Sequence, residues 1–250
     1  LPHAWQRGPL PGSTDRQSRQ LPWARALTAA MASCERKVNE PHAIAAFLPP
    51  QGRQHRCFKD VDMEISFRPL TADLWDDFAL LFGPSGACYG CWCQHFRLPP
   101  KVRQATPADG KKALMRQRVS GGPPPGLLAY ADGKPVGWMQ IGPRSDVPEW
   151  NNPGRVTTPV EPPGPGDWAI SCFFFKSSVR GKGLSHAILA EGIAFARQNG
   201  ALRLEACPMD KAKQSKSVGL FVGSTRVFAK AGFTEIALRK PGRPLMRLEL

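Results

Sequence analysis

The stretch Asp167–Gly200, DWAISCFFFKSSVRGKGLSHAILAEGIAFARQNG, carries the local pattern that decides the fold. Trp168, Ile170 and Phe173–Phe175 supply the aromatic and β-branched content of a buried strand. From Leu184 onward, apolar residues recur at helical spacing, and the closing Asn-Gly pair is a typical stop signal for a helix. The sequence therefore predicts a strand, a short basic turn and an amphipathic helix.

The turn itself reads Arg180-Gly181-Lys182-Gly183-Leu184-Ser185. Glycines at a strand-to-helix turn let backbone amides approach a ligand closely, and the helix N-terminus adds unpaired N–H groups and a partial positive charge. Arg180 and Lys182 add full charges, so the turn is predicted to bind phosphates. The Lys-Ser/Thr pair that ends a P-loop is absent, and the glycine spacing differs from the dinucleotide fingerprint.

The turn resembles the acyl-CoA pyrophosphate loop of the GNAT superfamily of N-acetyltransferases, whose pattern is Gln/Arg-x-x-Gly-x-Gly/Ala. Arg180 and Gly183 match this pattern, whereas Ser185 replaces the final small residue. The order of elements is also similar, because the segment Phe228–Phe233 (FAKAGF) resembles the last helix of the superfamily and its Gly-Phe exit. The resemblance covers Met63 to Leu250.

This resemblance implies an α/β fold with a mixed, mostly antiparallel central sheet flanked by helices on both faces. It implies an N-acetyltransferase that uses acetyl-CoA as co-substrate and acts on a small-molecule or peptide amine. The family's cofactor contacts carry over to the amides of Phe173, Phe174 and Phe175, which would polarise the acyl carbonyl, and to the pyrophosphate loop Arg180, Gly181, Lys182, Gly183, Leu184 and Ser185.

The sequence identifies the catalytic residues less clearly than it identifies the cofactor contacts. Glu205 lies on the predicted strand Leu202–Ala206 among apolar neighbours, where burial would raise its pKa and suit it to act as a base; a structural ion pair with an arginine is the alternative. Cys172 is placed to face the thioester, although a cysteine in such a strand is also typical of simple packing.

The general acid departs from the family pattern. Its members commonly carry a tyrosine four residues before the Gly of the Gly-Phe exit, and Phe228 occupies that place here. The thiolate would then be protonated by water, by Ser224 or by Thr225; alternatively the chain binds acyl-CoA without catalysis.

A second distinctive segment is the run from Cys88 to His95, CYGCWCQH. Cys88, Cys91, Cys93 and His95 together have the ligand types of a zinc site, which would make the chain a metal-stabilised binding module, but no second Cys-x-x-Cys pair exists. We therefore favour a loop over the acceptor mouth, without a metal. The residues predicted to face that mouth are Trp92, His95, Phe96, Trp138 and Arg144, with an ordinary core tryptophan and a solvated arginine as the alternative for the last two. The CWC motif resembles a loop of one bacterial branch of the superfamily.

Residues 1–62 are rich in Pro, Arg, Gln and Ser with scattered apolar residues, and predict a poorly ordered N-terminal extension before a domain at 63–250. Whether this extension belongs to the native protein is left open. Within the domain, helices are expected at 71–82, 107–119 and 225–231, strands at 64–68, 126–131, 135–142, 233–238 and 244–250, and loops at 83–100 and 144–166, the latter at the surface.

Composition narrows the functional classes further. The net charge is +14, but the excess is scattered, whereas nucleic-acid binding normally requires a denser basic stripe. No apolar run approaches the roughly 20 residues of a membrane span. Seven cysteines with no secretory signal indicate a reducing compartment, hence a cytoplasmic protein. A homodimer is left open.

Overall fold

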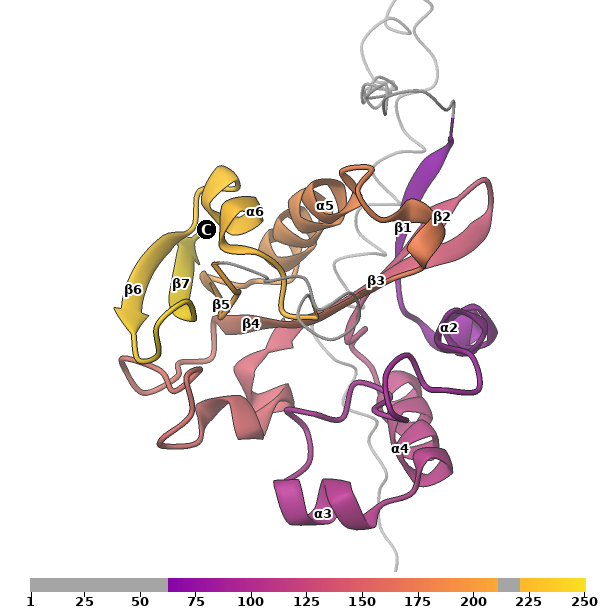
Figure 1. Cartoon of the computed structure of the whole chain (residues 1–250), viewed down its shortest axis with the longest axis horizontal. Helices are drawn as coiled ribbons and strands as arrows, with labels where there is room; N and C mark the ends of the chain where they lie inside the picture. Colours follow the sequence, from indigo (N-terminus) through magenta and orange to yellow (C-terminus); the bar gives the residue numbers. More distant parts are fainter. Residues whose placement is uncertain (1–62, 211–220) are drawn as a thin grey trace, which may run out of the picture. The chain divides into compact units, whose positions relative to one another are not determined.

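The computed structural model describes residues 63–210 and 221–250, so the predicted extension at 1–62 lies outside the described residues. One seven-stranded sheet forms the centre of the fold (Figure 1). Its strands are β1 (Ile65–Pro69), β2 (Gly126–Ala131), β3 (Lys134–Pro143), β4 (Asp167–Phe175), β5 (Arg203–Ala206), β6 (Thr234–Leu238) and β7 (Pro244–Glu249). The helices are α2 (Trp75–Phe82), α3 (Pro100–Ala105), α4 (Ala108–Ser120), α5 (Leu184–Gln198) and α6 (Thr225–Lys230). Short 3₁₀ turns lie at η1 (Ala72–Leu74), η2 (Arg144–Asp146), η3 (Pro148–Asn151) and η4 (Ser177–Val179).

The strand order is β1-β2-β3-β4-β5-β7-β6, and every neighbouring pair is antiparallel except β4 and β5. The predicted hairpin joins β2 to β3, with Asp132 and Gly133 at φ of 50° and 72°. Two consecutive residues with positive φ match the right-handed twist of the flanking strands. The predicted mixed, mostly antiparallel sheet is confirmed.

Helices cover both faces of this sheet (Figure 1). On one face, α5 and α6 pack their apolar side chains against β2, β3, β4 and β5, with Ile188, Leu189 and Phe228 fully buried. On the other face, α2 and α4 pack against β2 and β3 through Phe78 and Met115. The sheet is therefore the middle layer of three, as the α/β class requires.

Strand β4 separates from β5 part of the way along its length. The two strands pair from Asp167 to Ile170 of β4, and the pairing ends at Ala206 of β5. Beyond that point the Phe173 N–H donates a hydrogen bond to the Phe221 carbonyl, 2.6 Å away. The part of β4 nearest the glycine turn thus pairs with a loop segment instead of a strand.

Two expectations for the irregular regions need correction. Pro100 begins a short helix, α3, in the region between the predicted loop and the predicted second helix, and proline at the first helical position is a known start signal. The segment 144–166 is irregular but not simply a surface loop, because Val147, Trp150 and Thr157 are buried. Its Pro, Gly and Asn content indicates broken backbone regularity, which does not by itself imply exposure.

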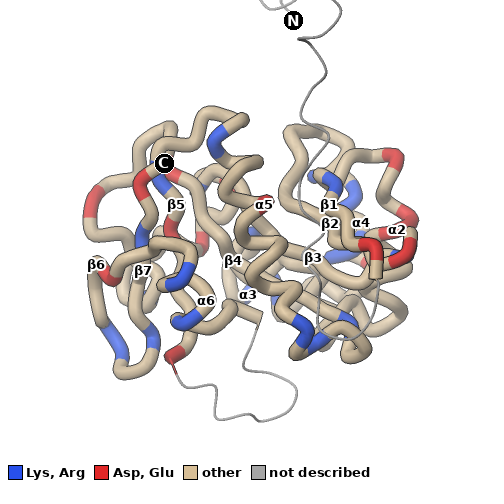
Figure 2. Tube along the Cα trace, turned by 90° about the horizontal axis from the view of Figure 1, so that it is seen from above, with Lys and Arg blue, Asp and Glu red and all other residues tan. Residues whose placement is uncertain are grey.

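Basic residues are spread over several elements of the described chain, interspersed with acidic ones (Figure 2). Within the residues that the structure describes, no helix has both the length and the apolar character needed to cross a membrane.

Candidate functional site

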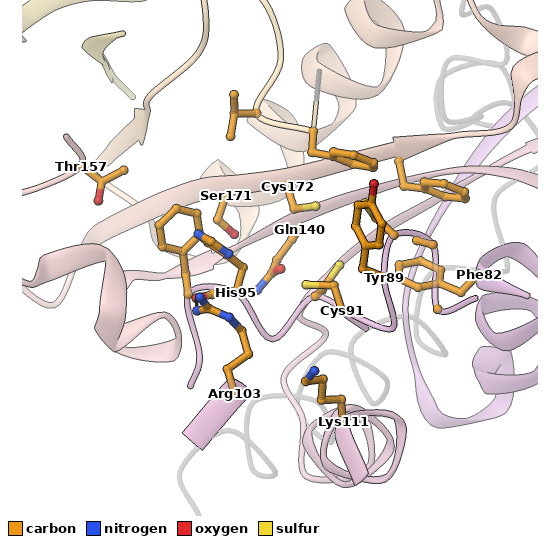
Figure 3. Close-up of a pocket in the computed structure, with 18 of the residues that line it drawn as sticks. Phe82, Tyr89, Cys91, His95, Arg103, Lys111, Gln140, Thr157, Ser171 and Cys172 are labelled. Atoms are coloured by element: carbon orange, nitrogen blue, oxygen red, sulfur yellow. Dashed lines mark hydrogen bonds between the residues drawn. The ribbon is translucent and has the colours of Figure 1, made fainter. Parts of the chain in front are cut away.

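A cavity of about 660 Å³ opens beside β4, on the side of the sheet away from α5. Its upper wall is β4 itself, through Ser171, Cys172 and Phe174 (Figure 3). The opposite wall comes from the loop 86–96, from α3 and from α4. Further residues come from the segment 155–157, from Phe221 and Val222, and from Arg243 between β6 and β7. The cavity is thus assembled from segments far apart in the sequence.

The cysteine-containing loop holds an unusual backbone conformation. Four of its non-glycine residues have positive φ, namely Ala87 (66°), Tyr89 (49°), Trp92 (45°) and Cys93 (58°). Left-handed conformations cost free energy for residues with a side chain, and they cluster at functional sites when the surrounding structure enforces them. Gly86 is required by space as well, since a Cβ there would lie 2.5 Å from the Trp92 ring nitrogen.

The thiols of this loop reach the cavity, but as protonated groups. Burial raises the pKa of the Cys91 thiol, and contact with Cys93 raises it further. Burial also raises the pKa of Cys93, with a further contribution from Cys172, against a lowering by the Trp138 ring N–H that donates to Cys93 Sγ at 3.1 Å. Protonated thiols are poor nucleophiles and poor metal ligands.

The geometry gives the zinc alternative no support. Across residues 63–210 and 221–250, no group of three or more His, Cys, Asp or Glu side chains is arranged to hold a metal ion. The arrangement of Cys88, Cys91, Cys93 and His95 therefore does not support a metal-stabilised binding module.

Cationic side chains surround the part of the cavity near His95. Arg103, Arg155 and Arg243 all line it with His95, and together with burial they lower the pKa of His95 to about 4. Partial burial of the imidazole is the larger cause, although His95 as a whole is an exposed residue. At neutral pH His95 is consequently an uncharged group in a positive surrounding.

Ser171 and Cys172 are the β4 residues closest to the middle of the cavity wall (Figure 3). The Ser171 side chain is 3% exposed, and its hydroxyl oxygen has no hydrogen-bond partner. A buried hydroxyl without a partner is costly, and such groups call for a bound ligand or water. Cys172 also lines the cavity, whereas its contact with a thioester stays a prediction.

The glycine turn follows the C-terminal end of β4 and leads into α5. Gly181 and Gly183 have φ of 78° and 83°, and Gly183 is the N-cap residue of α5. Arg180 is exposed, and its Nε donates to the Phe175 carbonyl at 3.0 Å. The turn therefore presents the N-terminus of a 15-residue helix together with an arginine held beside it.

Two aromatic residues predicted to face the acceptor mouth do not do so. Trp92 and Trp138 are 3% and 0% exposed and lie in the core under α2, where both rings pack against Phe82. Neither is among the residues that line the cavity. From the predicted loop, His95 and Phe96 do reach it. Aromatic side chains of this size are strongly driven into the core, and the tight turn at Gly86 directs Trp92 there.

Arg144 and Glu205, which the sequence also predicts to be functional, lie outside the cavity. Both side chains are 2% exposed, and Arg144 Nη1 lies 3.1 Å from Glu205 Oε2. Arg247 donates to Glu205 Oε1 from Nη2 at 2.9 Å. The apolar surroundings expected for Glu205 are thus replaced by two guanidinium groups, and neither Arg144 nor Glu205 lines the cavity.

Sequence reasoning missed the basic residues of the cavity and Ser171. Arg103 stands on the unpredicted helix α3, Lys111 on α4, and Arg155 and Arg243 in irregular segments. Each is an isolated basic residue in the sequence, so no local motif marks it. The one available signal was Pro100, which predicts a helix start two residues before Val102 and so gives Arg103 a fixed position.

Comparison with known proteins identifies the family of the chain. The model of the acetyltransferase (GNAT) family matches residues 92–221, just over half of the chain. No curated protein matches the sequence.

Solved structures of similar fold share little sequence identity with this chain. The PaiA N-acetyltransferase of Thermoplasma acidophilum, solved with coenzyme A, has 14% identity and a TM-score of 0.43, covering 75% of this chain and 100% of its own. The GNAT domain of PAT from S. lividans has 18% identity and a TM-score of 0.42, covering 74% and 89%. A GNAT-family acetyltransferase of Streptococcus pneumoniae has 14% identity and a TM-score of 0.43, covering 75% and 99%.

Proposed function

The chain belongs to the acetyltransferase (GNAT) family, and on that premise we propose that it is an acyl-CoA-dependent N-acyltransferase that transfers an acetyl group from acetyl-CoA to an amine. The observation that carries the proposal is the position of β4 between two features. The phosphate-binding turn follows its C-terminal end, and the cavity opens along Ser171 and Cys172. A cofactor held by the turn and an acceptor held in the cavity would meet at the same strand.

The cofactor half of the proposal rests on the turn 180–185. The amides of Gly181 to Ser185 would receive the pyrophosphate, since the first N–H groups of a helix have no partners within it. Arg180 and Lys182 are exposed and add two positive charges beside these amides. Leu184 is buried and anchors the turn to the core.

Polarisation of the acyl carbonyl would use the part of the β4 edge that is not paired with β5. The Phe173 N–H already donates to the Phe221 carbonyl, so the acyl oxygen would take the place of that carbonyl when acyl-CoA binds. The side chains of Phe174 and Phe175 lie on opposite faces of the sheet. Phe174 lines the cavity, whereas Phe175 packs on the face covered by α5.

The transfer step needs an unprotonated amine, whose nitrogen attacks the acyl carbon while the carbon–sulfur bond breaks. The proton lost by the nitrogen ends on the departing thiolate or on water. The sequence predicts Glu205 as the general base. Its ion pairs with Arg144 and Arg247 do not support that role. On the acid side, the Thr225 hydroxyl is buried without a hydrogen-bond partner, but neither Ser224 nor Thr225 lines the cavity.

The proposal is tested by mixing the purified full chain with acetyl-CoA and a panel of amines while measuring release of free thiol, alongside calorimetry of acetyl-CoA binding. We expect saturable binding and amine-dependent thiol release. Absence of acetyl-CoA binding would overturn the proposal. Binding without thiol release for any amine would favour a non-catalytic acyl-CoA-binding protein, which the phenylalanine at position 228 makes the second candidate.

Replacing Phe228 with tyrosine examines whether an acid limits turnover. Phe228 is fully buried, with its ring 6.0 Å from that of Phe173 on β4. A thiolate with a reference pKa of about 8.5 leaves readily near neutral pH without a donor. We therefore expect Phe228→Tyr to change the rate by less than about tenfold, against the ~10²–10⁴-fold typical of general acid catalysis where it limits the rate. A rise of about a hundredfold, measured as kcat in folded protein, would contradict this expectation.

A further inference from the structure

The charges that line the cavity are of one sign. Arg103, Lys111, Arg155 and Arg243 are among its lining residues, and no Asp or Glu is, within the part of the chain that the structure describes. Arg155 is neutralised by Glu149, whose Oε2 lies 2.8 Å from Arg155 Nη2. None of the other three has a carboxylate within ion-pair distance among the described residues.

The remaining contacts of these cations hold them in place without cancelling their charge. Arg103 Nη1 donates to the His95 carbonyl at 2.7 Å, and Arg243 donates from Nη2 to the Cys207 carbonyl at 3.1 Å. These carbonyls orient the two guanidinium groups, and each guanidinium keeps other N–H donors that can bind a ligand. Lys111 extends from α4 toward the same space as Arg103 (Figure 3). Arg103, Arg155 and Arg243 also lower the pKa of the neighbouring His95, although burial is the larger cause.

The cavity also has a polar group at its opposite wall and apolar surface between. Ser171, a residue 3% exposed with an unpartnered hydroxyl, lies on β4 across from Arg103 and Lys111 (Figure 3). Phe82, Phe96 and Phe174 contribute apolar surface to the lining. A ligand that fits would bear an anionic group near α3 and α4, an apolar middle, and a polar end at Ser171.

We propose that the acceptor is a small amine that carries an acidic group, a carboxylate or a phosphate, and that Arg103, Lys111 and Arg243 bind this group. The inference rests on the proposed N-acyltransferase function and specifies its acceptor. The amine is directed to Ser171 and Cys172 on β4, next to the edge where the acyl group would lie. A neutral or purely cationic amine would leave these three cations of the cavity lining without a counter-charge.

The same cations would assist the chemistry. A positive surrounding disfavours the ammonium form of a bound amine and so lowers its pKa. The amine nitrogen would then reach the acyl carbon uncharged, form the new carbon–nitrogen bond as the carbon–sulfur bond breaks, and release its proton to the thiolate or to water. The cavity would thus supply an unprotonated nucleophile without a dedicated carboxylate base.

The test compares matched pairs of amines that differ only in the acidic group. Calorimetry with the full chain, without acyl-CoA, measures binding of 4-(aminomethyl)benzoate against 4-(aminomethyl)benzamide, and of 6-aminohexyl phosphate against 6-aminohexanol, because each acidic probe has an apolar middle between its amine and its acidic group. We expect the acidic member of at least one pair to bind about tenfold or more tightly, as charge-assisted hydrogen bonds allow. The pair that shows the preference identifies carboxylate or phosphate as the recognised group.

Variants locate the binding site. We expect Arg103→Gln and Lys111→Gln each to reduce the preference by about tenfold, and Arg103→Lys to keep more of it than Arg103→Gln. Lys101→Gln is the matched control, because Lys101 is an exposed residue of the same helix α3 that does not line the cavity. The Lys101→Gln variant should prefer acidic over neutral amines by the same factor as the unaltered chain.

Equal binding of acidic and neutral amines, or no binding of any acidic probe, would overturn the inference. Thiol release from acetyl-CoA, measured separately with the same amines, distinguishes it from the proposed function. Binding of acidic amines without thiol release would contradict the function and keep only the assignment of the cavity as a binding site for the acidic group. Thiol release that is as fast with neutral amines would keep the function and remove the inference.

Discussion

Replacement of Glu205 by glutamine is expected to lower the free energy of unfolding by about 3–5 kcal/mol, the cost of removing one partner from a buried ion pair. The Glu205 carboxylate lies between Arg144 and Arg247, whose side chains are 2% and 12% exposed. After the substitution the Arg144 guanidinium would keep its contacts with Asn151 but lose its buried counter-charge. A charge left unpaired in the interior is among the few causes of such large destabilisation.

Denaturant unfolding of the two proteins at one pH measures this difference. Glu161→Gln is the control, because Glu161 also pairs with Arg247, at 3.3 Å, but its side chain is 54% exposed. An exposed pair contributes about 0–1 kcal/mol, so this control should change stability little. If Glu205→Gln shifted the stability by no more than the control, the buried network would not have the role assigned to it.

The same variant separates a structural role of Glu205 from the catalytic one predicted from sequence. The carboxylate is engaged by two arginines and does not line the cavity. We therefore expect the activity that is lost to follow the fraction of protein unfolded. A loss of about a hundredfold or more in turnover per folded molecule would instead support its action as a general base.

Reversal of charge at Arg180 is expected to weaken acetyl-CoA binding by about tenfold to a hundredfold. A hydrogen bond to a charged group contributes about 1.5–3 kcal/mol, and about 1.4 kcal/mol corresponds to a tenfold change in affinity. Arg180→Glu removes one such contact and places a like charge beside the pyrophosphate. Because Arg180 is exposed, the substitution should leave the fold intact.

Calorimetry of acetyl-CoA binding at low and moderate ionic strength measures the effect, which should shrink as salt screens the repulsion. Arg197→Glu provides the matched control, since Arg197 is exposed in the last turn of the same helix α5 and the change in net charge is identical. The helix places it roughly 20 Å from the turn at 1.5 Å per residue. Equal affinity losses in the two variants would remove the assignment of the turn as the pyrophosphate site.

Much of the fold follows from local signals along the chain. The aromatic run of β4, the glycine turn and the apolar periodicity of α5 each predict their element from neighbouring residues alone. Asp132-Gly133 likewise predicts its hairpin, because few residue pairs adopt positive φ twice in succession at low cost. These signals are reliable because they depend on backbone sterics and on one repeating period, both encoded within about ten residues.

The position of single side chains depends on partners that the local sequence does not contain. Val136 to Ile141 of β3 are all buried, so alternation along the strand could not tell whether Trp138 faces a cavity or the core under α2. Glu205 has apolar neighbours in sequence, yet its partner Arg247 comes from the adjacent strand β7.

The sequence by itself therefore determined the sheet-and-helix framework and the turn to which we assign phosphate binding. The tertiary structure alone decided the cavity, because Arg103, Lys111 and Arg243 come from separate elements and only chain folding brings their charges to one place. Electrostatic interaction acts through space, whereas sequence patterns report order along the chain, so a binding site built from isolated residues has no local signature.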